Sequence, residues 1–372
     1  MRAAASPSPA IALVDAADLS QWQTWCKEVG WQTLAPPAAS NTTADARVQA
    51  LAALIRDAVK NGSVDPARIY LAGRGEAAAD VFFAISRVPD LWAAAVALGG
   101  SPQPAIDSDL FFAANFTNVP VLWISPTAGD QPLAGKLEAA GIALEWRLRE
   151  QVQMSAVFEW LAKRSRDQYP PAIDCETNSP TFASCYWSRM TKFDAGERND
   201  VLPSSRMEPA LVAALDLGGF GYRPDDPGPG ILVTFLPEKY GGPLKMGDRI
   251  IALDGRELAD ARQYRELMAQ VKEDRQAAVM VQRGKQRVRL ETTVVLPRRA
   301  PVVTARVQAK YEPEEKEIQI VSRTVTEMQV TIPAQWVPAV LNWNGVALEK
   351  LETPGCRLLS MEKALENVKP CP

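Results

Sequence analysis

The sequence predicts an α/β domain with a doubly wound, mostly parallel sheet, together with a smaller α+β unit and a small all-β region. Between residues 10 and 168, short apolar runs alternate with stretches of helical periodicity. Residues 211–297 place one helical stretch among strand-like segments that follow a glycine-rich turn. Residues 302–359 contain strand-like segments. These three patterns indicate one large α/β layer and two smaller units rich in strands.

The first 168 residues justify a parallel sheet that is covered by helices on both faces. Helical stretches such as residues 45–60 and 78–88 lie between the apolar runs. Because parallel strands are joined by crossover connections, strand-helix alternation at this spacing predicts a doubly wound sheet. The runs expected to form its strands are residues 10–14, 31–35, 69–72, 93–98, 121–124 and 143–148.

The second half of the chain is expected to consist mainly of hairpins. Residues 169–194 predict a β-hairpin, because aromatic and β-branched residues surround a Ser-Pro turn, and a loop is expected to follow. In the α+β unit, a helix near residues 260–273 precedes a hairpin that turns at Gly284. The pair Asn344-Gly345 predicts a further hairpin. The tail after residue 360 is expected to form a short helix.

These segments divide the chain into three predicted domains, one of them discontinuous. The α/β domain takes residues 1–168, and the α+β unit takes residues 206–300. The all-β domain is assembled from residues 169–205 and 301–360. The α+β unit is therefore expected to be inserted into a loop of the all-β domain, as exposed loop tips tolerate.

Composition excludes several classes of function. The chain has 372 residues, a net charge of −3 and no histidine. Without histidine there is no Ser-His-Asp or Cys-His catalysis and no imidazole metal site. Lys and Arg are scattered, so no nucleic-acid partner is expected. We predict no cofactor, no metal and no membrane span, because no apolar stretch is long enough to cross a bilayer.

The five cysteines leave two alternatives for the compartment. Cys175 and Cys185 lie either side of a short turn-rich segment and could bridge a hairpin, and Cys356 could pair with Cys371. Two such bridges would indicate a periplasmic or extracellular protein, although the apolar run near the N-terminus is too short for a signal peptide. If all thiols are free, a cytoplasmic location is the alternative. Cys26 lies among tryptophans at helical spacing, which is typical of a cysteine whose thiol packs in the core.

One segment carries a specific resemblance. VDPARIYLAGRGEAAADVFFAISRVPDLWAAAVALGG (residues 64–100) resembles the strand, sharp turn and helix of esterase- and peptidase-like α/β-hydrolases, and NVPVLWISPTAGDQPLAGKLEAAGIALEWRLRE (residues 118–150) resembles their acid-bearing strand and loop. The resemblance covers roughly residues 10–165 and implies an α/β-hydrolase fold without its usual first strands. The corresponding turn consists of Gly73, Arg74, Gly75, Glu76 and Ala77.

The resemblance implies a catalytic set that this sequence lacks. The nucleophile position falls on Gly75, which has no side chain, and the acid position falls near Asp130. The histidine position falls within residues 151–154, where no histidine stands, and the oxyanion loop at residues 14–18 contains two carboxylates. Acidic groups there would repel a developing oxyanion. We therefore expect a degenerate site with no catalytic residue.

Two interpretations of the turn region stay open. Glu76, Asp130 or Cys26 could supply a non-standard catalytic set for an esterase or peptidase. The structural interpretation is that Glu76 and Arg74 simply form a charged helix start, since acidic residues are favoured at helix N-termini.

Residues 206–300 resemble a PDZ domain of the bacterial type. PLKMGDRIIALDGRELADARQYRELM and MVQRGKQRVRLET match the family's G-D, D-G and R-x-G segments at Gly247-Asp248, Asp254-Gly255 and Arg283-Gly284. PDZ domains bind an extended peptide as an added strand and hold its terminal carboxylate on a glycine-rich loop. The resemblance implies a loop and pairing strand formed by Leu217, Gly218, Gly219, Phe220, Gly221 and Tyr222, facing a helix with Tyr264, Leu267 and Met268. The alternative is a groove that a neighbouring segment fills.

The flanking β segments resemble the β-sandwich-like domain that follows the hydrolase core in some esterase-like proteins. Tyr169-Pro170 through Cys185-Tyr186-Trp187 matches the opening of that domain, and Glu317-Ile318 through Trp343-Asn344-Gly345 matches its ending. Three hypotheses for function follow. The first is a catalytically inactive hydrolase-like protein that binds the C-terminus or an internal strand of a peptide or protein through the PDZ-like groove. The others are an esterase or peptidase with a non-standard catalytic set and an architectural protein of a larger assembly.

Overall fold

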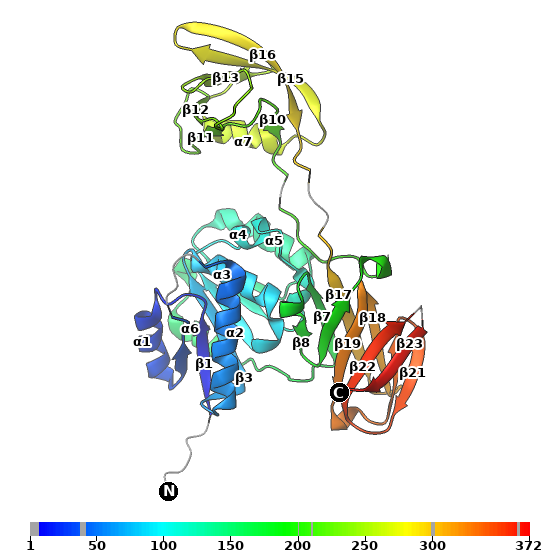
Figure 1. Ribbon diagram of the computed structural model, residues 1–372. Coiled ribbons are helices and arrows are strands. Elements are labelled where there is room, and N and C mark those ends of the chain that lie inside the picture. Colours follow the sequence, from blue (N-terminus) through cyan, green and yellow to red (C-terminus); the bar gives the residue numbers. More distant parts are fainter. Residues whose placement is uncertain (1–6, 38–41, 200, 210, 299–301, 363–364) are drawn as a thin grey trace. The chain divides into compact units, whose positions relative to one another are not determined.

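The computed structural model describes residues 7–37, 42–199, 201–209, 211–298, 302–362 and 365–372. The chain forms two compact units, one made of residues 1–208 and 302–372 and the other of residues 209–301 (Figure 1). The three-domain division stays a prediction, and its boundary residues 300 and 301 lie outside the described residues.

The first unit contains a six-stranded sheet in which every neighbouring pair of strands is parallel. The strand order is β2-β1-β3-β4-β5-β6. This sheet confirms the predicted α/β fold class. Its strands are β1 (Ser8–Leu13), β2 (Gln32–Leu34), β3 (Val64–Arg74), β4 (Ala94–Leu98), β5 (Val121–Ser125) and β6 (Leu144–Leu148).

Helices cover both faces of this sheet, because side chains that alternate along each strand enter two separate cores. On one face, Ala10, Leu71 and Ala97 pack against α2 (Ala44–Lys60), α3 (Ala77–Arg87) and α5 (Gln131–Ala139). On the other face, Ile11 and Tyr70 pack against α1 (Leu19–Val29) and α6 (Met154–Ala162). A further short helix is α4 (Gln103–Asp107).

The remaining strands of the first unit form two five-stranded sheets that share one hydrophobic core. One has the order β21-β20-β18-β17-β7 and the other β23-β22-β19-β9-β8. Their strands are β7 (Ala172–Thr177), β8 (Ser184–Cys185), β9 (Ser188–Phe193), β17 (Ala305–Glu312), β18 (Glu317–Arg323), β19 (Val325–Ile332), β20 (Ala339–Trp343), β21 (Val346–Leu351), β22 (Gly355–Glu362) and β23 (Leu365–Pro370).

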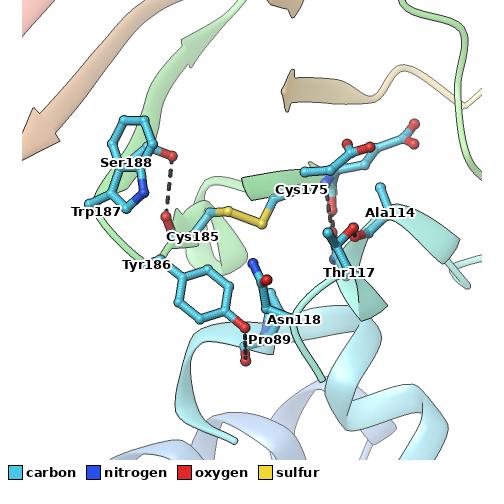
Figure 2. Close-up of a disulfide and its surroundings, with 12 residues drawn as sticks. Pro89, Ala114, Thr117, Asn118, Cys175, Cys185, Tyr186, Trp187 and Ser188 are labelled. Carbon is cyan, nitrogen blue, oxygen red and sulfur yellow. Dashed lines mark hydrogen bonds between the residues drawn. A yellow bond between two sulfur atoms is a disulfide. The ribbon is translucent and has the colours of Figure 1, made fainter. Parts of the chain in front are cut away.

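Two expectations for these strands were wrong. Residues 169–194 do not form one hairpin, because β7 pairs with β17 in one sheet while β8 and β9 pair in the other. The disulfide Cys175–Cys185 therefore joins the two sheets rather than the arms of a hairpin (Figure 2). The tail after residue 360 is a strand, β23, that pairs with β22 and is linked to it by the disulfide Cys356–Cys371. Local periodicity could not show either result, because strand pairing depends on distant partners.

Glu176 ties β7 to the α/β layer through its backbone and to two chain segments through its buried carboxylate. Glu176, in β7, is 1% exposed, and its side chain accepts hydrogen bonds from Ser204 Oγ (2.5 Å), from the Ser205 amide and hydroxyl (2.6 and 2.7 Å) and from the Thr304 hydroxyl. The Asn115 amide binds the backbone of Glu176 on both sides, at 2.7 and 2.9 Å. The strand, the α/β layer and both connections to the second unit meet at this residue.

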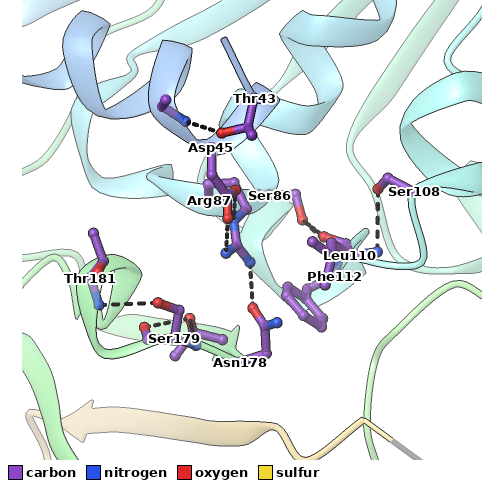
Figure 3. Close-up of polar contacts among 12 residues, drawn as sticks. Thr43, Asp45, Ser86, Arg87, Ser108, Leu110, Phe112, Asn178, Ser179 and Thr181 are labelled. Atoms are coloured by element: carbon purple, nitrogen blue, oxygen red, sulfur yellow. Dashed lines mark hydrogen bonds and ion pairs between the residues drawn. The ribbon is translucent and has the colours of Figure 1, made fainter. Parts of the chain in front are cut away.

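Arg87 forms a second tie between the same two layers. It lies in α3 with 1% of its side chain exposed, and its guanidinium donates to both carboxylate oxygens of Asp45 (3.0 and 3.2 Å) and to Asn178 Oδ1 (2.8 Å), as Figure 3 shows. The Phe182 ring lies 4.3 Å from the guanidinium carbon. Near the disulfide, the Tyr186 hydroxyl donates to the Pro89 carbonyl at 3.2 Å (Figure 2).

The second unit is a mixed structure built around α7 (Ala261–Ala269). Its sheet has the order β10-β16-β15-β13-β12-β11, and β14 pairs with β13. The expected hairpin at Gly284 joins the two longest strands of this unit. The strands are β10 (Ala214–Leu215), β11 (Gly221–Tyr222), β12 (Ile231–Phe235), β13 (Arg249–Leu253), β14 (Arg256–Glu257), β15 (Arg275–Arg283) and β16 (Gln286–Val295).

No helix within the described ranges is long and apolar enough to span a bilayer.

Arg87→Met is expected to lower the free energy of unfolding of the first unit by about 3 kcal/mol, because it leaves the Asp45 carboxylate and the Asn178 amide without their buried partner. Urea unfolding followed by circular dichroism measures the change. The control is Arg47→Met, which removes an ion pair to Asp80 in which both side chains are about a third exposed. It is expected to cost about 0.5 kcal/mol. Equal effects of the two substitutions would contradict the role of Arg87.

Candidate functional site

A cavity of about 470 Å³ lies at the carboxyl ends of β3, β4 and β5. In open α/β sheets, ligands bind in crevices at this edge of the sheet. Residues from three strand ends, from α1 and from the segment before α6 line the cavity. They are Trp25, Arg74, Gly75, Leu98, Gly99, Ile124, Arg149, Val152, Gln153 and Met154.

Glycine is required for the sharp turn that forms the cavity floor. Gly75 has a φ of +60°, in the left-handed region that favours glycine, and its amide donates to the Leu98 carbonyl at 2.7 Å. A Cβ atom on Gly73 would lie 2.4 Å from the Ala77 carbonyl oxygen, and one on Gly100 would lie 1.9 Å from the Gly75 carbonyl oxygen. The turn therefore retains its close backbone packing, whereas a Cβ on Gly75 would meet open space.

The lining residues offer positive charge and no group that could act as nucleophile or base near neutral pH. Arg74 lies 3.7 Å from Asp18 in an ion pair in which both side chains are more than a third exposed. Arg149 is exposed and forms no ion pair with the residues that the structure describes. Gln153 is the remaining polar side chain of the lining. None of these residues carries a hydroxyl, thiol, carboxylate or amine.

The candidates for a non-standard catalytic set do not meet in this cavity. The Asp130 carboxylate accepts a 2.5 Å hydrogen bond from Ser125, whose side chain is fully buried. Glu76 is exposed directly before α3, and its side chain makes no capping hydrogen bond. Cys26 is 1% exposed in α1, and burial raises the pKa of its thiol despite a hydrogen bond with Thr33. A buried thiol with a raised pKa is a poor nucleophile.

The sequence did not identify the cavity walls. Trp25, Arg149 and Met154 were not candidates, although the histidine position of the resembled family falls at residues 151–154, next to Arg149. The tertiary fold brings α1 and this segment to the same cavity as Gly75. The sequence pointed to this wall only through the histidine position of the resembled family, which falls at residues 151–154.

In the second unit, the predicted glycine-rich loop ends at the outermost strand of the sheet. β11 pairs with β12 on one side and is the last strand in the order. Gly218 and Gly219 have φ values of +83° and +77°. The backbone N–H groups of Gly218, Gly219 and Phe220 have no hydrogen-bond acceptor among the described residues. Leu217 is 2% exposed, and its carbonyl accepts from the Tyr240 hydroxyl at 2.5 Å.

The predicted opposite wall, α7, lies against this strand but is partly turned into the core. Tyr264 and Met268 are 5% and 0% exposed and belong to the core of the unit, while Leu267 is half-buried. The Tyr222 ring packs edge-on against Tyr264 with 5.4 Å between centroids. Burial raises the pKa of Tyr264. The structure thus brings the strand and the helix together, with Tyr222 between them.

The G-D segment of the PDZ-like sequence fixes the turn before β13. Asp248 is 1% exposed and accepts hydrogen bonds from Arg283 at 2.9 and 2.7 Å and from the Lys245 amide at 2.8 Å. Burial raises the pKa of this carboxyl, but the bonds from Arg283 and Lys245 outweigh it, so that the pKa lies below its ordinary value. These motif residues therefore have a structural role.

Across the described ranges, no group of three or more Asp, Glu or Cys side chains is arranged to hold a metal ion.

No protein-family model matches the chain, and no curated relative matches it. Solved structures with similar parts include a thermostable esterase (15% identity, TM-score 0.32, 44% of this chain and 57% of that chain) and Est1E from Butyrivibrio proteoclasticus (12% identity, TM-score 0.31, 43% and 87%). The HtrA-type protease AlgW, solved with a decapeptide, matches at 22% identity and a TM-score of 0.19 over 24% of this chain and 30% of that chain. The chain thus spans little more than half of the thermostable esterase and less than a third of the protease. These similarities give no information about the chemistry of this chain.

Alanine substitutions test the packing of the glycine turn. Gly75→Ala is expected to lower the free energy of unfolding by about 1 kcal/mol, because it places a side chain at positive φ without a steric clash. Gly100→Ala is expected to cost about 3 kcal/mol, because its Cβ would overlap the Gly75 carbonyl.

The matched control is Gly135→Ala in α5, where a Cβ would meet nothing and φ is not positive. It is expected to raise the free energy of unfolding by about 0.5 kcal/mol, because alanine favours helix. Urea unfolding of the three variants gives the order of their free energies of unfolding. If Gly100→Ala were as mild as Gly75→Ala, the close packing of this turn would be refuted.

Proposed function

We propose that this chain is a catalytically inactive, hydrolase-like protein that binds the C-terminus of a peptide or protein through its second unit. The observation that carries this proposal is the loop of three consecutive backbone N–H groups, at Gly218, Gly219 and Phe220, that have no acceptor among the described residues. They directly precede β11, the outermost strand of the sheet.

The loop and the strand supply the two parts of peptide recognition. Positive φ at Gly218 and Gly219 allows successive N–H groups to converge, and such concave backbone segments bind anions. A terminal carboxylate would accept these hydrogen bonds. The preceding peptide residues would pair with the open side of β11 as an added strand. Leu267 and Phe220, both half-buried beside the strand, would contact the side chains of the peptide.

The absence of catalysis is supported by the cavity of the first unit. Its described lining residues contain no nucleophile, and the chain has no histidine. The hydrolase-like sheet would then serve as a scaffold. The two disulfides favour an oxidising compartment, and they support our proposal of a periplasmic or extracellular location.

A library of C-terminal peptides tests the proposal on the full chain. Peptides that bind with a free carboxylate are expected to lose about tenfold or more in affinity as C-terminal amides, because hydrogen bonds to a charged group are lost. Gly219→Pro removes one N–H donor and the positive φ, so binding should be abolished. Fluorescence anisotropy of labelled peptides gives the affinities.

The control is Gly219→Ala, which keeps the N–H donor and adds strain only, so measurable binding should remain. Circular dichroism checks that both variants fold. If amidated peptides bind as tightly as free acids, the loop does not hold a carboxylate. Separately, turnover of chromogenic esters that persists through full purification would contradict the proposed lack of catalysis.

A further inference from the structure

The cavity beside Gly75 has an electrostatic character that peptide binding by the second unit does not use. Arg74 and Arg149 both line it, and no acidic side chain does. Two carboxylates adjoin these residues in sequence, Glu76 and Glu150, and both are exposed outside the lining. Asp18 is the acidic partner of Arg74, at 3.7 Å. Arg149 has no such partner among the described residues.

Two helix N-termini add to this positive potential. The eleven-residue helix α3 begins at Ala77, two residues after Gly75, and the nine-residue helix α6 begins at Met154, which itself lines the cavity. Neither helix has a side-chain cap at its first turn. Because the N-terminus of a helix carries partial positive charge, both helices favour an anion in the cavity.

Apolar side chains form a large part of the cavity wall. Trp25 and Ile124 line it together with Leu98 and Val152. The Trp25 ring packs edge-on against the buried Trp22, with 5.2 Å between centroids. The volume of about 470 Å³ lies in the range of small-molecule sites, which are mostly apolar with a few polar groups that fix orientation.

We propose that this cavity binds a small organic carboxylate with an apolar body. The guanidinium groups of Arg74 and Arg149 hold the carboxylate, since a planar guanidinium matches the two oxygens of a carboxylate. The apolar body lies against Trp25, Ile124 and Met154. No covalent step takes part, because no lining residue can attack the ligand. Hydrolase-like folds have a nucleophile at the position of Gly75, whereas in this chain the arginines beside that position bind an anion.

Octanoate is the probe, compared with octanamide, octyl phosphate and inorganic phosphate by isothermal titration calorimetry on the full chain. Octanoate is expected to bind at least tenfold more tightly than octanamide, which has the same apolar body without charge, and more tightly than inorganic phosphate, which has charge without the body. Octanoate binding at least as tight as that of octyl phosphate assigns the site to a carboxylate, and tighter binding of octyl phosphate overturns that assignment.

Substitutions separate charge from packing. Met154→Glu places a negative charge in the lining and should reduce octanoate affinity at least tenfold more than Met154→Gln, which has the same size and removes apolar contact without adding charge. Arg149→Gln should weaken octanoate about tenfold, and Arg189→Gln, at an exposed arginine on β9, should leave affinity unchanged.

Three results would overturn the proposal: no octanoate binding by the unsubstituted chain, equal affinity for octanamide, or unchanged affinity in Arg149→Gln. Binding of inorganic phosphate as tight as octanoate would indicate an adventitious anion only and would also overturn it. Peptide binding by the second unit is measured on the same variants. Its failure leaves these results unaffected, so the two proposals can fail independently.

Discussion

The first unit depends on one buried carboxylate. Removing Glu176 from water is costly, and that cost is offset only because four donors from two distant segments reach its oxygens. Those segments, around Ser204 and Thr304, are the two ends between which the second unit is inserted. Asn115 fixes the backbone of the same residue from the α/β layer. The Glu176 side chain therefore holds the two segments that flank the second unit, while its backbone is held by the α/β layer.

The backbone geometry of the glycine turn is held by close packing. Contacts at Gly73 and Gly100 leave no room for a Cβ, so the backbone of the turn is held by packing and not by function. A Cβ atom on Gly75 would meet no other atom, because this residue faces the cavity. Fold and activity are separable for this reason, since activity resides in side chains that the fold does not require. Here the side chains at the cavity supply charge and apolar surface.

Each compact unit offers a different means of binding. The first presents a cavity whose arginines and helix termini favour a small anion. The second presents backbone N–H groups beside an open strand edge, which suit an extended chain with a terminal carboxylate. Both proposed sites would bind negative charge through hydrogen-bond donors, and in a chain without histidine no imidazole can take that role.

The sequence by itself determined the fold class, because alternation of apolar runs with helical periods is a local property that each segment carries. Residues 93–98 and 121–124 are strands β4 and β5 almost to the residue. From Gly75 and the lack of histidine it also predicted that the usual hydrolase chemistry is missing. Only the tertiary structure decided that Cys175 and Cys185 join two sheets, that the tail is a strand, and that Trp25 and Arg149 face one cavity. These outcomes depend on pairing and packing between residues far apart in the chain, which no local pattern records.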